Sequence, residues 1–151
     1  MSRKAPIALI EQTVMILIFA LAAALCLRVF AWSDLRSVRN DARDQAVLVT
    51  QSAAETLKAE GGDMAHALTE ACEEMGGNCA QGLWYICYDE NWNQVSDSQP
   101  CVYRLTAQGE PAPVEGMWQA RVWMDVEEEI SVGGTYNGPL FELTVAWQEG
   151  A

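Results

Sequence analysis

Residues 7–32 read IALIEQTVMILIFALAAALCLRVFAW, and this stretch decides the fold. No charged residue stands between Thr13 and Leu27, because Leu, Ile, Val, Phe, Met and Ala fill most of the run. A helix over residues 7–27 would be about 31 Å long, enough to cross the roughly 30 Å hydrocarbon core of a bilayer. Arg28 and Trp32 follow where a membrane interface would begin. The stretch therefore predicts a membrane-spanning helix over residues 7–32.

Glu11 is the one charged residue near the start of this run. A carboxylate inside a transmembrane segment costs on the order of a few kcal/mol unless it is paired or close to the interface, and such residues are usually functional. The alternative is that Glu11 lies in the headgroup layer. The run is too long for a cleaved secretory signal and carries Glu11 and Gln12 at its front, so we expect the helix to be retained.

The stretch PIALIE at residues 6–11, followed by the apolar run, resembles the start of type IV pilins and of type II secretion pseudopilins. Proteins of that family have a short basic leader, a prepilin-peptidase cleavage site, a Glu five residues into the mature chain and a hydrophobic helix. The resemblance makes residues 1–6 a leader-like segment, Ile7 the first mature residue and Glu11 the family's Glu. In that family the Glu is thought to pair with the free amino terminus of a neighbouring subunit, which would offset the desolvation of both charges.

Pro6 departs from the family pattern, since the residue before the cleavage site is normally Gly. Proline has no amide N–H and a fixed φ. Two outcomes are therefore open: cleavage between Pro6 and Ile7, or a chain that keeps its leader. The resemblance extends through residues 1–60 in sequence, and beyond them only in the layout of a long helix on a small sheet.

Charge is divided unevenly along the 151 residues, whose formal net charge is −12. Residues 1–58 hold seven Lys and Arg against five acidic residues, whereas residues 59–151 hold two, Arg104 and Arg121, against sixteen. So acidic a C-terminal part disfavours nucleic acid or anionic lipid as its direct partner. It is compatible with a solvated domain at a cell surface.

Four of the five cysteines lie in the C-terminal part. Cys26 falls in the apolar helix, where a thiol behaves as a small apolar group. Four cysteines in a small domain behind a membrane anchor indicate two disulfides and an oxidising, extracytoplasmic compartment. Three connectivities are possible, and the shortest loops come from Cys72–Cys79 and Cys87–Cys101. The spacings do not resemble the paired ligands of a structural zinc site.

The arginines that follow the apolar helix conflict with this topology. Arg3 and Lys4 precede the helix, but four arginines follow it, at Arg28, Arg36, Arg39 and Arg43. The positive-inside rule alone would place the C-terminal part in the cytoplasm. We give more weight to the cysteines and to the leader resemblance, and predict that the head is extracytoplasmic.

Residues 33–60 predict a helical stalk that continues from the membrane helix. They contain no Gly or Pro, and apolar or small residues recur in steps of 3, 4, 4, 3, 4 and 4 at Leu35, Val38, Ala42, Ala46, Val49, Ala53 and Leu57. A continuous helix of some 50 residues would be about 75 Å long. We expect its distal half to pack on the head and its proximal half to contact neighbouring helices.

Residues 61–151 predict a short helix and an antiparallel meander. Gly61 and Gly62 end the stalk, Asp63 caps a second helix, and Gly76 and Gly77 stop it. The periodicity then changes to two, which predicts strands over residues 83–88, 92–95, 101–107, 117–126 and 140–148. Short connections between them favour an antiparallel sheet with one face on the stalk.

Catalytic motifs are not recognisable in this sequence. The lone His66 lacks the orienting groups that catalysis needs, and the run Asp125 to Glu129 lacks the spacing of a calcium loop, so we expect a solvated edge and no metal or other cofactor. Trp92, at a predicted turn, and Trp123, on the polar face of a predicted strand, are candidate contact residues.

The sequence therefore predicts an α+β protein with a leader-like segment (1–6), a transmembrane helix (7–32), a helical stalk (33–60) and an acidic, β-rich extracytoplasmic head (61–151). The expected role is structural rather than enzymatic: a single-pass minor pilin or pseudopilin of a pilus, secretion or DNA-uptake apparatus. Its expected partners are membrane lipid and other pilin-like subunits, with no direct nucleic-acid partner and no identified small-molecule substrate. The alternative is a non-polymerising single-pass membrane protein whose acidic ectodomain binds a partner or envelope component.

Overall fold

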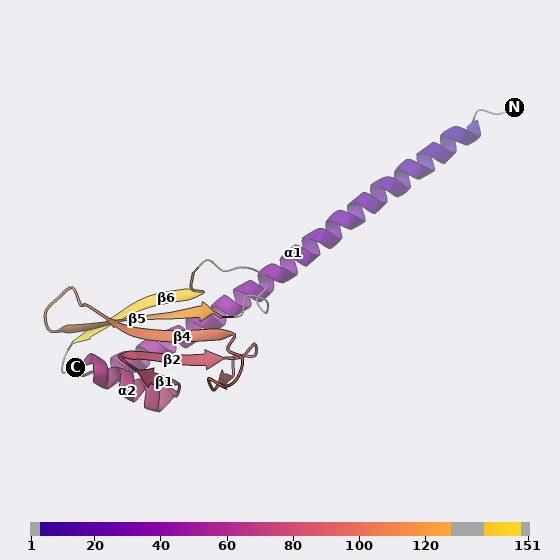
Figure 1. Ribbon diagram of the computed structural model, residues 1–151. Helices are drawn as coiled ribbons and strands as arrows, with labels where there is room; N and C mark the ends of the chain where they lie inside the picture. The colour runs from indigo at the N-terminus through magenta and orange to yellow at the C-terminus, as the bar shows by residue number, and fades with distance from the viewer. Residues whose placement is uncertain (1–3, 128–137, 149–151) are drawn as a thin grey trace. The chain divides into compact units, whose positions relative to one another are not determined.

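The computed structural model describes residues 4–127 and 138–148 (Figure 1). The chain divides into two units, Met1–Val38 and Arg39–Ala151. One continuous helix, α1 (Lys4–Glu60), passes through both. The predicted α+β class is confirmed, since a second helix and an antiparallel sheet follow α1.

The described residues of the first unit, 4–38, are all helical. Pro6 lies inside α1 without ending it, which is possible because proline is tolerated in the first turn, where an N–H has no partner within the helix. Every side chain from Leu9 to Val38 is exposed. The predicted stripe residues Leu35 and Val38 are 52% and 45% exposed, so the described residues of this unit leave them open to solvent.

In the second unit, α1 buries one face. The buried residues are Ala42, Ala46, Thr50, Ala53, Ala54 and Leu57. The predicted stripe is confirmed from Ala42 onward, and Thr50 joins it because its spacing of four residues from Ala46 keeps it on the same face. This face, which is rich in small side chains, belongs to the same apolar cluster as the buried residues of the sheet.

The second helix, α2 (Met64–Met75), begins and ends where the sequence predicts. The Asp63 side chain accepts a hydrogen bond from the backbone N–H of His66 at 2.8 Å, which caps the helix. Gly76, with φ of +82°, lies at the other end, and its N–H donates to the Cys72 carbonyl at 2.9 Å. Ala67, Leu68 and Ala71 form the buried face of α2.

The described residues form a six-stranded antiparallel sheet. Its order is β1-β2-β4-β5-β6, and β3 pairs with β2 on the same edge as β1. The predicted meander is confirmed, because the long strands pair in chain order. The strands are β1 (Asn78–Ala80), β2 (Leu83–Tyr88), β3 (Gln94–Val95), β4 (Tyr103–Glu110), β5 (Met117–Val126) and β6 (Phe141–Gln148).

Strand boundaries differ from the prediction at three places, and β1 was not predicted. The strand expected over residues 140–148 begins one residue later, at Phe141. The expected strand over residues 92–95 shrinks to β3, because residues 89–93 form a turn held by the Asp89 side chain. The expected strand over residues 101–107 begins two residues later and continues to Glu110, where Pro111 follows. The two-residue β3 and the three-residue β1 are too short to produce a clear alternating pattern.

The core of the second unit lies between one sheet face and the helices. Rows of paired residues cross the sheet on this face, such as Trp84, Ala107, Val122 and Leu143. These residues form one apolar cluster with α1 and α2. Figure 1 shows the C-terminal part of α1 behind the sheet. The Trp147 indole N–H donates to the Gly62 carbonyl at 3.0 Å, so the last strand is tied to the end of α1.

Candidate functional site

Glu11 is exposed on α1 within the apolar stretch. Among the side chains that the structure describes, none donates a hydrogen bond to Glu11 or pairs with it. Leu9 and Ile10 beside it are 69% and 64% exposed. The helix therefore presents a carboxylate that can meet a cation only outside the described part of this chain.

The apolar surface around Glu11 extends over the whole first unit. Large apolar side chains are exposed from Leu9 to Trp32, and Phe19 and Phe30 are 77% and 75% exposed. Removing such a side chain from water is worth about 1.5–3 kcal/mol. By length and composition, this helix is sufficient to cross a membrane. The described residues contain no other helix with this property.

Pro6 and Ile7, the predicted cleavage site, lie in the first turns of α1. Their side chains fall outside the described part of the structure. Cleavage between them remains a prediction.

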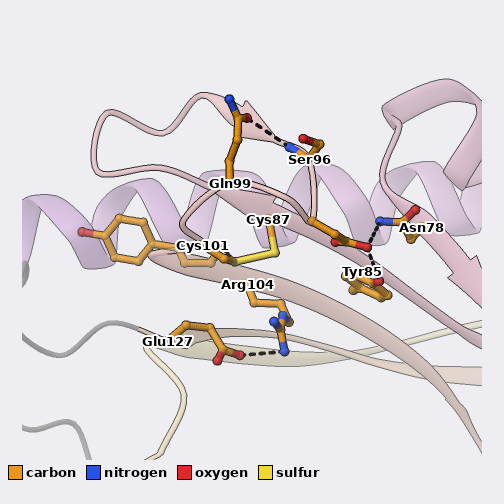
Figure 2. Close-up of a disulfide and its surroundings, with 10 residues drawn as sticks. Asn78, Tyr85, Cys87, Ser96, Gln99, Cys101, Arg104 and Glu127 are labelled. Atoms are coloured by element: carbon orange, nitrogen blue, oxygen red, sulfur yellow. Dashed lines mark hydrogen bonds and ion pairs between the residues drawn. A yellow bond between two sulfur atoms is a disulfide. The ribbon is translucent and has the colours of Figure 1, made fainter.

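The Cys87–Cys101 disulfide is present, as the shortest-loop pairing predicts. It joins β2 to the segment that leads into β4, with Cα atoms 5.3 Å apart. Cys87 is buried on the sheet face opposite the helices. The bond ties the segment that carries Ser96 and Gln99 to β2, and Figure 2 shows this segment beside the disulfide.

Cys72 and Cys79 are thiols in this structure. The Cys72 Sγ lies 3.6 Å from the Gly77 carbonyl oxygen, and the Cys79 Sγ lies 3.8 Å from that of Leu68, so each thiol sits beside the backbone that carries the other. Burial, followed by the proximity of Cys79, raises the pKa of the Cys72 thiol. The structure brings the two residues together, and their pairing remains a prediction. Cys26 is an exposed thiol on α1.

Polar and aromatic groups surround the disulfide in Figure 2. Asp97 accepts hydrogen bonds from Asn78 at 3.0 Å and from the Tyr85 hydroxyl at 2.9 Å. The bond to Asp97 raises the pKa of Tyr85. Arg104 pairs with Glu127 at 2.9 Å and lies over the Tyr85 ring.

An open depression of 510 Å³ lies among these groups, and Leu83, Asp97 and Thr106 contribute to its walls. Both arginines of the acidic part, Arg104 and Arg121, stand on this sheet face, and each is paired with a carboxylate. Both arginines of this face are therefore neutralised by carboxylates, and Asp97 and Asp125 accept hydrogen bonds from uncharged donors. Among the residues that the structure describes, this face shows no unpaired cation that would indicate an anionic ligand. Sequence reasoning missed these pairs, and the polar positions of the alternating strands were the signal that could have located them.

Trp92 is partly buried in the turn between β2 and β3. Its ring stacks on Tyr103, with centroids 4.2 Å apart and planes 11° apart. Its φ of +62° lies in the left-handed region, which the turn held by Asp89 imposes. These contacts give Trp92 a packing role, and its role as a contact residue remains a prediction.

Trp123 lies on the polar sheet face, where the sequence predicts it. Its indole N–H donates to Asp125 at 2.7 Å, and the Arg121 guanidinium lies 5.2 Å from its ring centroid. Glu142 pairs with Arg121 and raises the pKa of that arginine. Trp123 is thus held in place by its neighbours and remains partly exposed.

The described residues contain no cluster of three or more His, Cys, Asp or Glu side chains that could hold a metal ion. Glu128 and Glu129, which belong to the predicted acidic edge, lie outside the described residues. Comparisons with models of protein families, with curated proteins and with solved structures found no match to this chain.

Proposed function

We propose that this chain is a membrane-anchored, pilin-like structural subunit, a minor pilin or pseudopilin of a pilus, secretion or DNA-uptake apparatus. The observation that carries the proposal is Glu11 on an apolar helix whose side chains from Leu9 to Val38 are all exposed. Lipid would cover this surface before assembly, and the helices of other subunits would cover it afterwards. Glu11 would then pair with a cation of a neighbouring subunit.

The second unit supports the same proposal. The C-terminal half of α1 packs its small-residue face on an antiparallel sheet, which is the layout that the resemblance implies. The N-terminal half of α1 is apolar and exposed, whereas its C-terminal half packs on a small domain. This division suits a subunit that polymerises through its helix. The polar sheet face remains for contacts outside the helical assembly.

The mature N-terminus tests this proposal. Intact mass and N-terminal sequencing are applied to the protein purified from its native membrane. A chain that begins at Ile7 would support processing as a pilin-like subunit, and a loss of four hydrogens would report two disulfides. A chain that begins at Met1 would mean that Pro6, in place of the family's Gly, prevents cleavage. It would favour the alternative, a non-polymerising single-pass membrane protein.

The proposed extracytoplasmic location of the second unit has its own test. After mild reduction of intact cells, a membrane-impermeant thiol reagent should label the exposed Cys79. A Cys26→Ser background removes the thiol of the apolar helix from the measurement. Labelling that appears only after lysis would place the second unit in the cytoplasm.

A further inference from the structure

We propose that Arg28, Trp32 and Arg36 form a binding site for the phosphate group of an anionic phospholipid. This inference rests on the membrane anchoring in the proposed function and deepens it. The three residues are spaced by four and four, so they lie on one face of α1, directly after the apolar stretch. All three are exposed in the first unit.

The Arg36 side chain folds back toward the apolar stretch. Its guanidinium carbon lies 5.3 Å from the centroid of the Trp32 ring, four residues earlier in the helix. This contact brings the charge of Arg36 back by four residues, which is about 6 Å along the axis. The stack also holds a flexible side chain against an aromatic face, so less freedom is lost when a ligand binds.

The depth of the three residues matches the headgroup layer. If the hydrocarbon span ends at Leu27, Trp32 lies about 7.5 Å further along the helix. The headgroup layer adds roughly 5–7 Å on each side of the hydrocarbon core. Arg28 then stands at the inner border of that layer, and the Arg36 guanidinium, at the level of Trp32, stands near its outer border. Lipid phosphates lie between these two levels.

The charges are also complementary to a phosphate. Among the described residues, no carboxylate pairs with Arg28 or Arg36. Asp34 is six residues from Arg28 and two from Trp32, which places it away from their face of the helix. Guanidinium groups bind phosphate through paired N–H donors, so two of them one turn apart suit a lipid phosphate.

The site concerns two of the four arginines that conflict with the positive-inside rule. Cations that follow the helix on its extracytoplasmic side disfavour the proposed orientation. Anionic headgroups attract arginines held at the membrane surface, at roughly fivefold in affinity for each arginine, in whichever leaflet carries the anionic lipid. With the second unit outside, as proposed, Arg28 and Arg36 would therefore bind anionic phospholipid of the extracytoplasmic leaflet.

Native mass spectrometry of the full chain in detergent tests the site. Phosphatidylglycerol and phosphatidylcholine of equal chain length are added in equal amounts, and bound lipid is counted. The wild type should prefer phosphatidylglycerol by roughly 10- to 25-fold, because the choline cation of phosphatidylcholine offsets the charge of its phosphate and each arginine contributes about fivefold toward an anionic lipid. Arg28→Gln with Arg36→Gln should bring the ratio close to one. Lys58→Gln, which removes one positive charge from the far end of the same helix, should leave the preference unchanged.

One more variant, a competing anion and a membrane extraction separate the possible outcomes. Trp32→Ala should weaken the preference by releasing Arg36, and excess inorganic phosphate should fail to displace the lipid. Displacement by inorganic phosphate would mean a free-anion site and would overturn the lipid assignment. Equal binding of both lipids by the wild type, or full preference in the double variant, would also overturn it. Release of the wild type from membranes by alkaline carbonate would instead contradict the anchoring itself.

Discussion

The indole N–H of Trp147 donates to the carbonyl oxygen of Gly62 at 3.0 Å, joining residues 85 positions apart in the chain. Trp147 is 3% exposed and belongs to the last described strand, whereas Gly62 directly follows α1. The bond therefore links the edge of the sheet to the point where the chain leaves the long helix.

Trp147→Phe should lower the free energy of unfolding of the second unit by about 1–3 kcal/mol, because the Gly62 carbonyl loses its donor while the aromatic packing is largely kept. Chemical denaturation of the full chain in detergent, followed by near-ultraviolet circular dichroism, measures this change. Trp123→Phe is the matched control, because its indole bonds to Asp125 on the polar face. An equal loss in the two variants would contradict the role of the Gly62 bond.

Gly77 should tolerate no side chain. Its φ is +96°, and an added Cβ would meet the Tyr85 carbonyl oxygen and would come within 2.7 Å of the Ile86 Cγ1. Gly82 has a similar φ of +76°, but a Cβ there meets nothing within 4 Å. Gly82→Ala should therefore cost about 1–2 kcal/mol from backbone strain alone, and Gly77→Ala should cost clearly more or prevent folding. Similar thermal stability of the two variants would show that β2 does not lie this close to Gly77.

Asp89 should make the second unit sensitive to acid. Hydrogen bonds from Asn93, and then from the Asn91 backbone, hold the pKa of Asp89 below its ordinary value of 3.8. Since the pKa is lower in the folded state, the unfolded state binds more protons, so the stabilisation is present above about pH 4 and is lost as the pH falls through the folded value. Unfolding measured between pH 6 and pH 2 should show a smaller acid-induced loss in Asp89→Asn. An unchanged pH profile would contradict the role of the carboxylate in this turn.

The Cys87–Cys101 bond should contribute more to stability than any bond between Cys72 and Cys79. It spans a sequence separation of 14, and a loop of this size is worth about 3 kcal/mol in the chain-entropy model. We expect Cys87→Ser with Cys101→Ser to lower the free energy of unfolding by about that amount in non-reducing buffer. Cys72→Ser with Cys79→Ser is the control and should cost less. The reverse order would mean that the main covalent link lies between α2 and β1.

The long elements could be predicted from the sequence, because each buries one face and its apolar residues therefore recur with the period of a helix or a strand. The stripe from Ala42 to Leu57 has helical spacing, and β5 alternates over its full length, with Ala120, Val122 and Met124 buried. The short strands β1 and β3 could not, because two or three residues establish no period. The sequence places Trp92 at a turn, but its stacking on Tyr103 could not be predicted, since it depends on the turn that Asp89 holds and on the start of the next long strand.

The candidate site was predictable in the first unit and much less so in the second. Glu11 is identifiable because a charged residue within an apolar membrane-spanning run is energetically costly and usually functional. The helix around it is continuous. The ion pair of Arg104 with Glu127 and the hydrogen bonds to Asp97 join loops to strands. Such pairs depend on strand register and on the Cys87–Cys101 bond, neither of which local periodicity reveals.

Incorporation of a Glu11→Gln variant tests the central claim most directly. The variant keeps the size and shape of the side chain and removes its charge. The wild type, Glu11→Gln and the control Glu55→Gln, an exposed carboxylate further along α1, are expressed at equal levels. Filaments or envelope complexes are then isolated, and the amount of this chain is measured against the amount left in the membrane.

We expect the wild type and Glu55→Gln to enter the assembly equally, and Glu11→Gln to remain in the membrane with its second unit folded. Equal incorporation of all three chains would contradict the assembly role of Glu11. A failure of all three to enter any assembly would instead favour the non-polymerising membrane protein.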